Sequence, residues 1–358
     1  MFSKKAVAAF FALTMCLVLA SPGIAAEIKS FKNLSFNGAY VDRHPTPVHV
    51  FIPFFKEAEK FSNGELTFNY FANNTLFPER EGIGAASDGR VDFSTIRASV
   101  FPGTMNLIGV MDLPGLGPNA IVGSLVTQEV IEKFPEVTAE FPANTVPYVS
   151  WTSAAYQIHS LMAIKNIDDL KGKKIIVWDA VGLEVMKALG ANPIRLDSND
   201  TYLALSKGMG DGVFCPMAPV RSMKITEVAK FHTMTNLGVS AFNMMVYKPL
   251  WDAMPDKFRN WLKGEGGMKM ALAAGKSLED GQVADIKWME EQGHKIFYLD
   301  DATRAPFIKP LNTFAETWLQ DCAKRNLTKA PEILKFVRER ILFHTEQMRK
   351  GVYGSYRM

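Results

Sequence analysis

Hydrophobic positions in the first two thirds of the chain switch repeatedly between a helical spacing and a strand spacing. Apolar residues from Val48 to Phe61 repeat every three or four positions, which predicts a helix that ends at Asn63-Gly64. Leu66, Phe68 and Tyr70 alternate with polar residues, which predicts a strand directly after that helix. This alternation is typical of an α/β fold with mainly parallel strands.

The same order of elements recurs further along the chain. Predicted helices span about 79–88, 181–189 and 199–208, and predicted strands span 91–95, 174–177, 194–196 and 212–215. From Pro249 onward the pattern is mainly helical, with one predicted strand at 295–299. The proline-free, amphipathic stretch 268–292 predicts a long helix that braces two domains, and 307–324 and 331–348 predict two closing helices.

The N-terminus has the three parts of a secretory signal peptide. Lys4 and Lys5 precede an apolar run over 6–20, and small residues follow up to Ala26. The run is too short for a membrane-spanning helix. We therefore expect residues 1–26 to be removed and the mature protein to be soluble in the periplasm.

Length and composition narrow the class further. Removal of the signal peptide leaves about 332 residues, more than one core usually organises, so we expect two domains. We place the first at 27–150 with part of 240–285, and the second at 151–240 with part of 286–358. The chain carries 40 Lys and Arg against 37 Asp and Glu. This near-neutral balance excludes nucleic acid as a partner.

Several motifs carry a family resemblance. The segment from Asp168 to Val177 resembles the D-L-K-G-x-K-I-R-V signature of solute-binding proteins from tripartite ATP-independent periplasmic (TRAP) transporters. Further matching pieces occur in the family's order at 62–64, 73–77, 89–92, 112–114, 188–193, 201–205, 208–212 and 248–251. The resemblance implies a two-domain periplasmic binding protein fold with a ligand cleft, crossing hinge strands and a long helix that spans both domains. It also implies delivery of a small organic solute to sodium-driven membrane permease subunits, without catalysis or cofactor.

The resemblance fails at the positions that bind the cargo. In the family, two arginines and an amide usually hold a carboxylate. The main arginine position is Ile176 here, the second is Tyr156, and the amide position is Cys215. Because a buried carboxylate needs a cationic partner, we expect a cargo other than a simple mono- or dicarboxylate. Cys215 and Cys322, the cysteines that remain after cleavage, are expected to be free and buried.

Aromatic residues cluster near the predicted strand ends. Trp151, Tyr156, Trp178 and Phe214 lie where this fold would direct them into the cleft, and Asp179 follows Trp178. Aromatic faces beside a carboxylate suit a small amine or amino alcohol, and they also suit a stacked aromatic ring. The alternative is that each of these aromatic residues belongs to the core between the domains.

Three charged residues complete the candidate ligand-binding set. Glu79 stands at a predicted helix start, where it can bind ligand or cap the helix. Arg97 and Arg221 are the cations that would hold the cargo if it is an organic acid after all; the alternative is that both are solvated at the surface.

Catalytic and metal sites are not predicted. None of the six histidines is spaced with carboxylates or cysteines as metal ligands are, and no hydrolase, zinc-protease or phosphate-loop motif occurs. The loop 115–120 lacks the third glycine of a dinucleotide fingerprint. We expect a non-enzymatic carrier; the alternative is a periplasmic enzyme or sensor module that has reused the fold.

Overall fold

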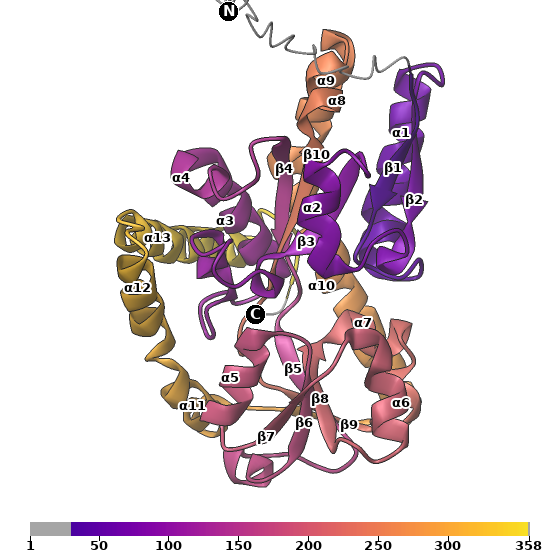
Figure 1. The fold of residues 1–358 in the computed structure, drawn as a ribbon. Coiled ribbons are helices and arrows are strands. Elements are labelled where there is room, and N and C mark those ends of the chain that lie inside the picture. The colour runs from indigo at the N-terminus through magenta and orange to yellow at the C-terminus, as the bar shows by residue number, and fades with distance from the viewer. Residues whose placement is uncertain (1–29, 357–358) are drawn as a thin grey trace, which may run out of the picture. The chain divides into compact units, whose positions relative to one another are not determined.

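The computed structural model describes residues 30–356, and the predicted signal peptide lies outside them. The strands form two separate sheets (Figure 1). The first sheet has the order β2-β1-β3-β10-β4, and its strands span Leu66–Phe71, Phe31–Asn37, Phe93–Arg97, Ala241–Tyr247 and Thr145–Thr152. The second has the order β11-β9-β5-β8-β6-β7, with strands at Lys295–Tyr298, Phe231–Met234, Tyr156–Ser160, Gly212–Pro216, Lys174–Val177 and Asn192–Arg195.

Both sheets are mixed, but only one strand in each runs against the others, so most strands are parallel, as the sequence predicted. Strand β10 runs antiparallel to β3 and β4, and β5 runs antiparallel to β8 and β9. These antiparallel strands flank the places where the chain passes between the sheets, from β4 into β5 and from β9 back into β10. A chain that crosses and returns must reverse direction, so a purely parallel sheet is not available to it.

The helices confirm most of the predicted elements. They span Ile52–Phe61 (α1), Gly82–Ser87 (α2), Ala120–Lys133 (α3), Pro135–Thr138 (α4), Ala180–Ala188 (α5), Thr201–Ser206 (α6), Met217–Ser222 (α7), Lys248–Ala253 (α8), Asp256–Glu265 (α9), Gly267–Glu291 (α10), Asp301–Ile308 (α11), Phe314–Lys324 (α12) and Ala330–Arg349 (α13). Helix α1 ends at the predicted Asn63-Gly64, where both residues have positive φ. The single helix predicted over 307–324 is wrong, because the chain breaks into α11, a short turn at Lys309–Leu311 that contains Pro310, and α12.

Helix α10 contacts elements of both sheets, as the sequence predicted for a bracing helix. It packs on α3 and β4 beside the first sheet and on α7 and β11 beside the second. Its contact with α3 is very close, since a Cβ at Gly275 would lie 2.7 Å from the Cα of Ile121. No helix in the described part of the chain is long and apolar enough to cross a membrane.

The second sheet has a hydrophobic core on each face. Ile175 and Val177 of β6 pack with α5 on one face, whereas Ile176 packs with α6 and α7 on the other. This alternation is the two-residue period of a strand. The first sheet packs against α3, α12 and α13 in a third core. The free thiols of Cys215 and Cys322 are both buried, as expected.

Candidate functional site

A cavity of about 850 Å³, called the main cavity below, is lined by residues from both sheets and their connections. Residues that line it include Tyr40, Glu79, Arg97, Tyr156, Trp178 and Phe242. Arg97 ends β3 of the first sheet, whereas Tyr156 begins β5 of the second and Trp178 follows β6. A volume of this size is typical of sites for small organic ligands.

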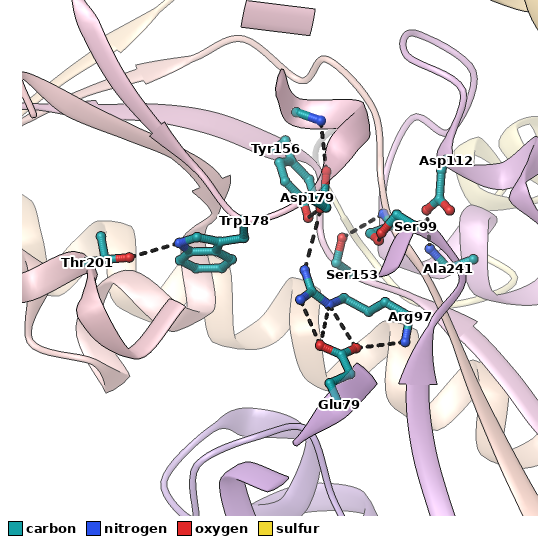
Figure 2. Close-up of polar contacts among 12 residues, drawn as sticks. Glu79, Arg97, Ser99, Asp112, Ser153, Tyr156, Trp178, Asp179, Thr201 and Ala241 are labelled. Atoms are coloured by element: carbon teal, nitrogen blue, oxygen red, sulfur yellow. Dashed lines mark hydrogen bonds and ion pairs between the residues drawn. The ribbon is translucent and has the colours of Figure 1, made fainter. Parts of the chain in front are cut away.

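Arg97 is the central charge of the main cavity, and Glu79 holds it from the side of the first sheet. Its Nη2 and Nε donate to the two Glu79 carboxylate oxygens at 2.8–3.2 Å, and its backbone N–H donates to the same carboxylate at 2.8 Å (Figure 2). The two side chains are only 12% and 14% exposed. Burial alone would lower the pKa of Arg97, but the neighbouring Glu79 carboxylate outweighs it and holds that pKa well above its usual value.

Asp179 approaches Arg97 from the opposite side. Its Oδ2 lies 3.5 Å from Arg97 Nη1 and 3.4 Å from the Tyr156 hydroxyl, which donates to it. Its Oδ1 accepts from the Gly182 N–H at 2.8 Å and so caps the start of α5. Figure 2 shows Arg97 between the two carboxylates. Glu79, Arg97, Tyr156 and Asp179, all predicted site residues, are therefore brought together.

Aromatic rings line the walls beside this charged group. The Tyr156 and Phe214 rings are 5.0 Å apart between centroids. The Trp178 indole N–H donates to the Thr201 hydroxyl at 2.9 Å, which fixes the ring at the edge of the main cavity. Burial raises the pKa of Tyr156 well above its usual value, and the Asp179 carboxylate adds to that effect, so the phenol remains a donor.

Six predicted site residues do not line the main cavity: Asp179 and Phe214 line a smaller cavity described below, and the other four line neither. Ile176 and Cys215 are fully buried in the core beneath α6 and α7, because a strand directs alternate side chains to opposite faces. Trp151 is fully buried beneath the main cavity, where its indole N–H donates to the Tyr40 hydroxyl at 3.0 Å. Arg221 is 45% exposed and pairs instead with Asp285 of α10 at 3.0 Å.

A second, smaller cavity of about 20 Å³ is called the inner cavity below. Tyr156 lines both it and the main cavity, whereas Ser99, Asp112, Pro114 and Val181 line both it and a third cavity of about 490 Å³. Its polar lining consists of Ser99, Asp112, Tyr156, Asp179 and Ser240. Asp112 and the two serines were not anticipated from the sequence, because 111–114 has the composition of an ordinary turn. The burial of an aspartate beside Leu113-Pro114 becomes visible only in three dimensions.

Asp112 is a buried carboxyl with one incompletely bonded oxygen. The residue is 5% exposed, and its Oδ1 accepts from the Ala241 N–H at 2.7 Å. Its Oδ2 makes no well-formed hydrogen bond, although the nearby Ser240 hydroxyl acts on the carboxyl. Burial raises the pKa of Asp112 to about 7, and the negative charge of Asp179 adds to the shift.

Three of the buried histidines form a hydrogen-bonded chain at the second sheet. His159 Nδ1 lies 2.8 Å from His232 Nδ1, and His232 Nε2 lies 2.8 Å from His294 Nδ1. The Cys215 carbonyl at one end only accepts and the Lys230 ammonium at the other only donates, so all three imidazoles are neutral with fixed tautomers. Within residues 30–356, no group of three or more histidine, cysteine or acidic side chains is arranged to hold a metal ion.

Comparisons with known proteins agree with the fold. The family model for bacterial extracellular solute-binding protein, family 7 (DctP), matches residues 39–321. The C4-dicarboxylate-binding periplasmic protein DctP of Rhodobacter capsulatus is 26% identical over 244 residues, which are 67% of this chain and 72% of that protein.

Solved structures share the arrangement as well. A TRAP solute-binding protein from Rhodoferax ferrireducens, in complex with copurified benzoate, has a TM-score of 0.82 at 21% identity, over 88% of this chain and 98% of that one. A TRAP periplasmic solute-binding protein from Chromohalobacter salexigens with bound D-glucuronate has a TM-score of 0.75 at 18% identity, over 86% of this chain and 100% of that one. At these identities the likeness shows the fold.

Proposed function

Because the chain belongs to family 7 of the bacterial extracellular solute-binding proteins, we propose that it is the binding subunit of a TRAP-type transporter. In this proposal the protein is exported through the signal peptide at 1–26, and the two sheets with their helices act as two domains. The domains close over a small organic solute and deliver it to membrane permease subunits. The observation that supports this proposal is the main cavity, which is lined by Arg97 at the end of β3 in the first sheet and by Tyr156 at the start of β5 in the second.

Closure of the two domains over a ligand is expected because residues from both sheets line the main cavity. A ligand that touches Glu79 and Arg97 on one side and Tyr156 and Trp178 on the other makes both sets of contacts only when the two sides are together. Such a ligand binds the closed state more tightly and shifts the population toward it. No catalytic role is needed for this function.

We propose a cargo that is not a simple carboxylate, such as a small amine, an amino alcohol or an aromatic compound. Arg97, the innermost cation, already has Glu79 as its partner, and a second carboxylate, Asp179, stands beside it. A cargo carboxylate bound at Arg97 would therefore lie beside two carboxylates that already share this guanidinium, which costs binding free energy. The aromatic walls supply stacking area for a ring or a face for a cation.

A second candidate cargo is an organic acid held by Arg97. Its Nη1 has only the 3.5 Å contact with Asp179, which leaves a donor directed at the cavity. The solved relatives with benzoate and D-glucuronate favour this candidate.

The test is a melting-temperature screen of the mature protein against amines, neutral aromatic compounds, aromatic acids, uronates and dicarboxylates. A ligand present at a hundred times its Kd stabilises the folded state by about 2.7 kcal/mol, which gives a clear shift. Shifts from amines or neutral aromatic compounds support the proposed cargo, and shifts from acids alone support the second candidate. If no class of solute shifts the melting temperature and the protein purified from periplasm carries no solute, the proposed function is wrong.

A further inference from the structure

The inner cavity has more negative charge than its surroundings neutralise. Asp112 and Asp179 both line it, and Arg97 is the nearest cation that acts on either carboxyl. Arg97 makes its close hydrogen bonds to Glu79, through Nε and Nη2, and reaches Asp179 only at 3.5 Å. One guanidinium is therefore shared among three carboxyl groups.

The unpartnered oxygen of Asp112 indicates that a hydrogen-bond donor is missing from the inner cavity. Asp112 Oδ2 is buried without a well-formed hydrogen bond, whereas Oδ1 has the Ala241 N–H. An unpaired buried acceptor is unfavourable, and a donor placed beside it relieves that cost. Ser99 and Ser240 hydroxyls, 3.4 Å apart, line the same cavity and can accept further hydrogen bonds.

The size and the walls of the inner cavity restrict what can enter. Its volume of about 20 Å³ accommodates one group of the size of a water molecule. Apart from the polar groups, its lining is apolar and aromatic, including Val181, Phe214 and Leu237. A group with several donors, a positive charge and this size is a primary ammonium.

We propose that Asp112 and Asp179 form a subsite for the protonated primary amino group of the cargo, whose remaining part occupies the main cavity. This subsite rests on the proposed solute capture, because it assigns one end of the captured molecule. Tyr156 lies at the junction of the two cavities, where its ring can face the carbon next to the amino group. Asp112 is thereby assigned as a specificity-determining residue.

The experiment compares matched probes on the full mature protein by calorimetry and thermal shift. The probes are 2-phenylethylamine, its neutral counterpart 2-phenylethanol, benzoate and D-glucuronate. We expect the amine to bind at least tenfold more tightly than the alcohol, and Asp112→Asn to reduce that advantage by about ten- to a hundredfold. Asp92→Asn is the control, because Asp92 bonds Ser35 within the first sheet and lines neither cavity.

The amide of Asp112→Asn keeps an acceptor for the Ala241 N–H, so this variant is expected to fold. Should it not fold, the pH dependence of the wild-type protein decides. Asp112 faces Arg97, Asp179 and Tyr156, and it becomes protonated as the pH falls through about 7. Amine affinity should therefore decrease as the pH is lowered from 8 to 6, while binding of the neutral alcohol stays constant.

Other results distinguish failure of the amino-group subsite from failure of the proposed solute capture. If benzoate or D-glucuronate binds wild type and Asp112→Asn equally and the amine binds neither, the subsite is wrong and solute capture stands. If the amine binds equally well to wild type and Asp112→Asn, the assignment of Asp112 is overturned. If none of the probes and no periplasmic solute binds, the subsite and the proposed function both fail.

Discussion

Replacement of Arg97 by methionine is expected to destabilise the protein strongly, because it leaves two carboxylates without their cation. Arg97 makes three side-chain hydrogen bonds of 2.8–3.2 Å to Glu79 and a 3.5 Å contact with Asp179. In the variant, Glu79 retains only the backbone N–H of residue 97. Asp179 is 4% exposed and Glu79 14% exposed, so water reaches neither fully.

The magnitude follows from this burial. Removal of one member of a buried ion pair costs about 3–5 kcal/mol, most of it from the uncompensated charge that remains. Arg221→Met is the matched control, since Arg221 also pairs with one aspartate, at 3.0 Å, but is 45% exposed. Asp285 is itself 12% exposed, so the loss of Arg221 should exceed that of a fully exposed pair. It should still be smaller than the loss of Arg97, which leaves two buried carboxylates without their cation.

The assay is equilibrium unfolding in urea at pH 7.5, followed by fluorescence of the tryptophans. The double variant Glu79→Gln with Arg97→Met should lose less than the two single losses combined, because the orphaned charge of Glu79 is gone. A loss for Arg97→Met no larger than that for Arg221→Met would refute the reasoning.

Three further predictions concern packing and ionisation elsewhere in the fold. Gly275→Ala should lower the free energy of unfolding in urea by about 1–3 kcal/mol, because the new Cβ would lie 2.7 Å from the backbone of α3. Gly264→Ala in α9 has open space around it and should be neutral or stabilising. Equal effects of the two changes would contradict the close packing of α10 on α3. Burial raises the pKa of Glu279 to about 7, so the folded protein becomes less stable as the pH rises from about 4.5 through 7. Glu279→Gln cannot ionise. Its free energy of unfolding should therefore exceed that of wild type by up to about 3 kcal/mol at pH 8 and equal it at pH 4.5. Burial lowers the pKa of His159 to about 3 and of His232 to about 2, so nitrogen-detected NMR should find both rings neutral at pH 5. Each ring should lower the free energy of unfolding by about 1.4 kcal/mol for every pH unit below 6.5. Titration of either ring near pH 6 would contradict the buried histidine chain.

The sequence predicted the regular elements well where one face of an element is polar. Helix α1 and strand β2 have such a face, and the spacing of their hydrophobic residues identifies them. Strand β10 was missed because it is buried almost throughout and shows no alternation. Its antiparallel pairing with β3 and β4 is a tertiary property that no local pattern encodes.

The candidate site was predicted in part. Glu79, Arg97 and Asp179 lie next to the ends of predicted elements, and the fold brings such ends together. Motif matching placed Ile176 at a ligand position but did not determine its direction; the strand period turns its side chain away, toward α6 and α7. Asp112 belongs to the matching piece 112–114, but it was not predicted as a site residue, since its importance depends on burial and on an oxygen without a partner.

The most direct test of solute capture and delivery is uptake into proteoliposomes that contain TRAP-type permease subunits from the same organism. Labelled solute, identified by the melting-temperature screen, is supplied outside with a sodium gradient, with and without the purified binding protein. The account predicts that uptake requires the binding protein, that Arg97→Met abolishes it, and that the solute arrives chemically unchanged. Equal uptake without the protein, or conversion of the solute by the protein alone, would contradict it.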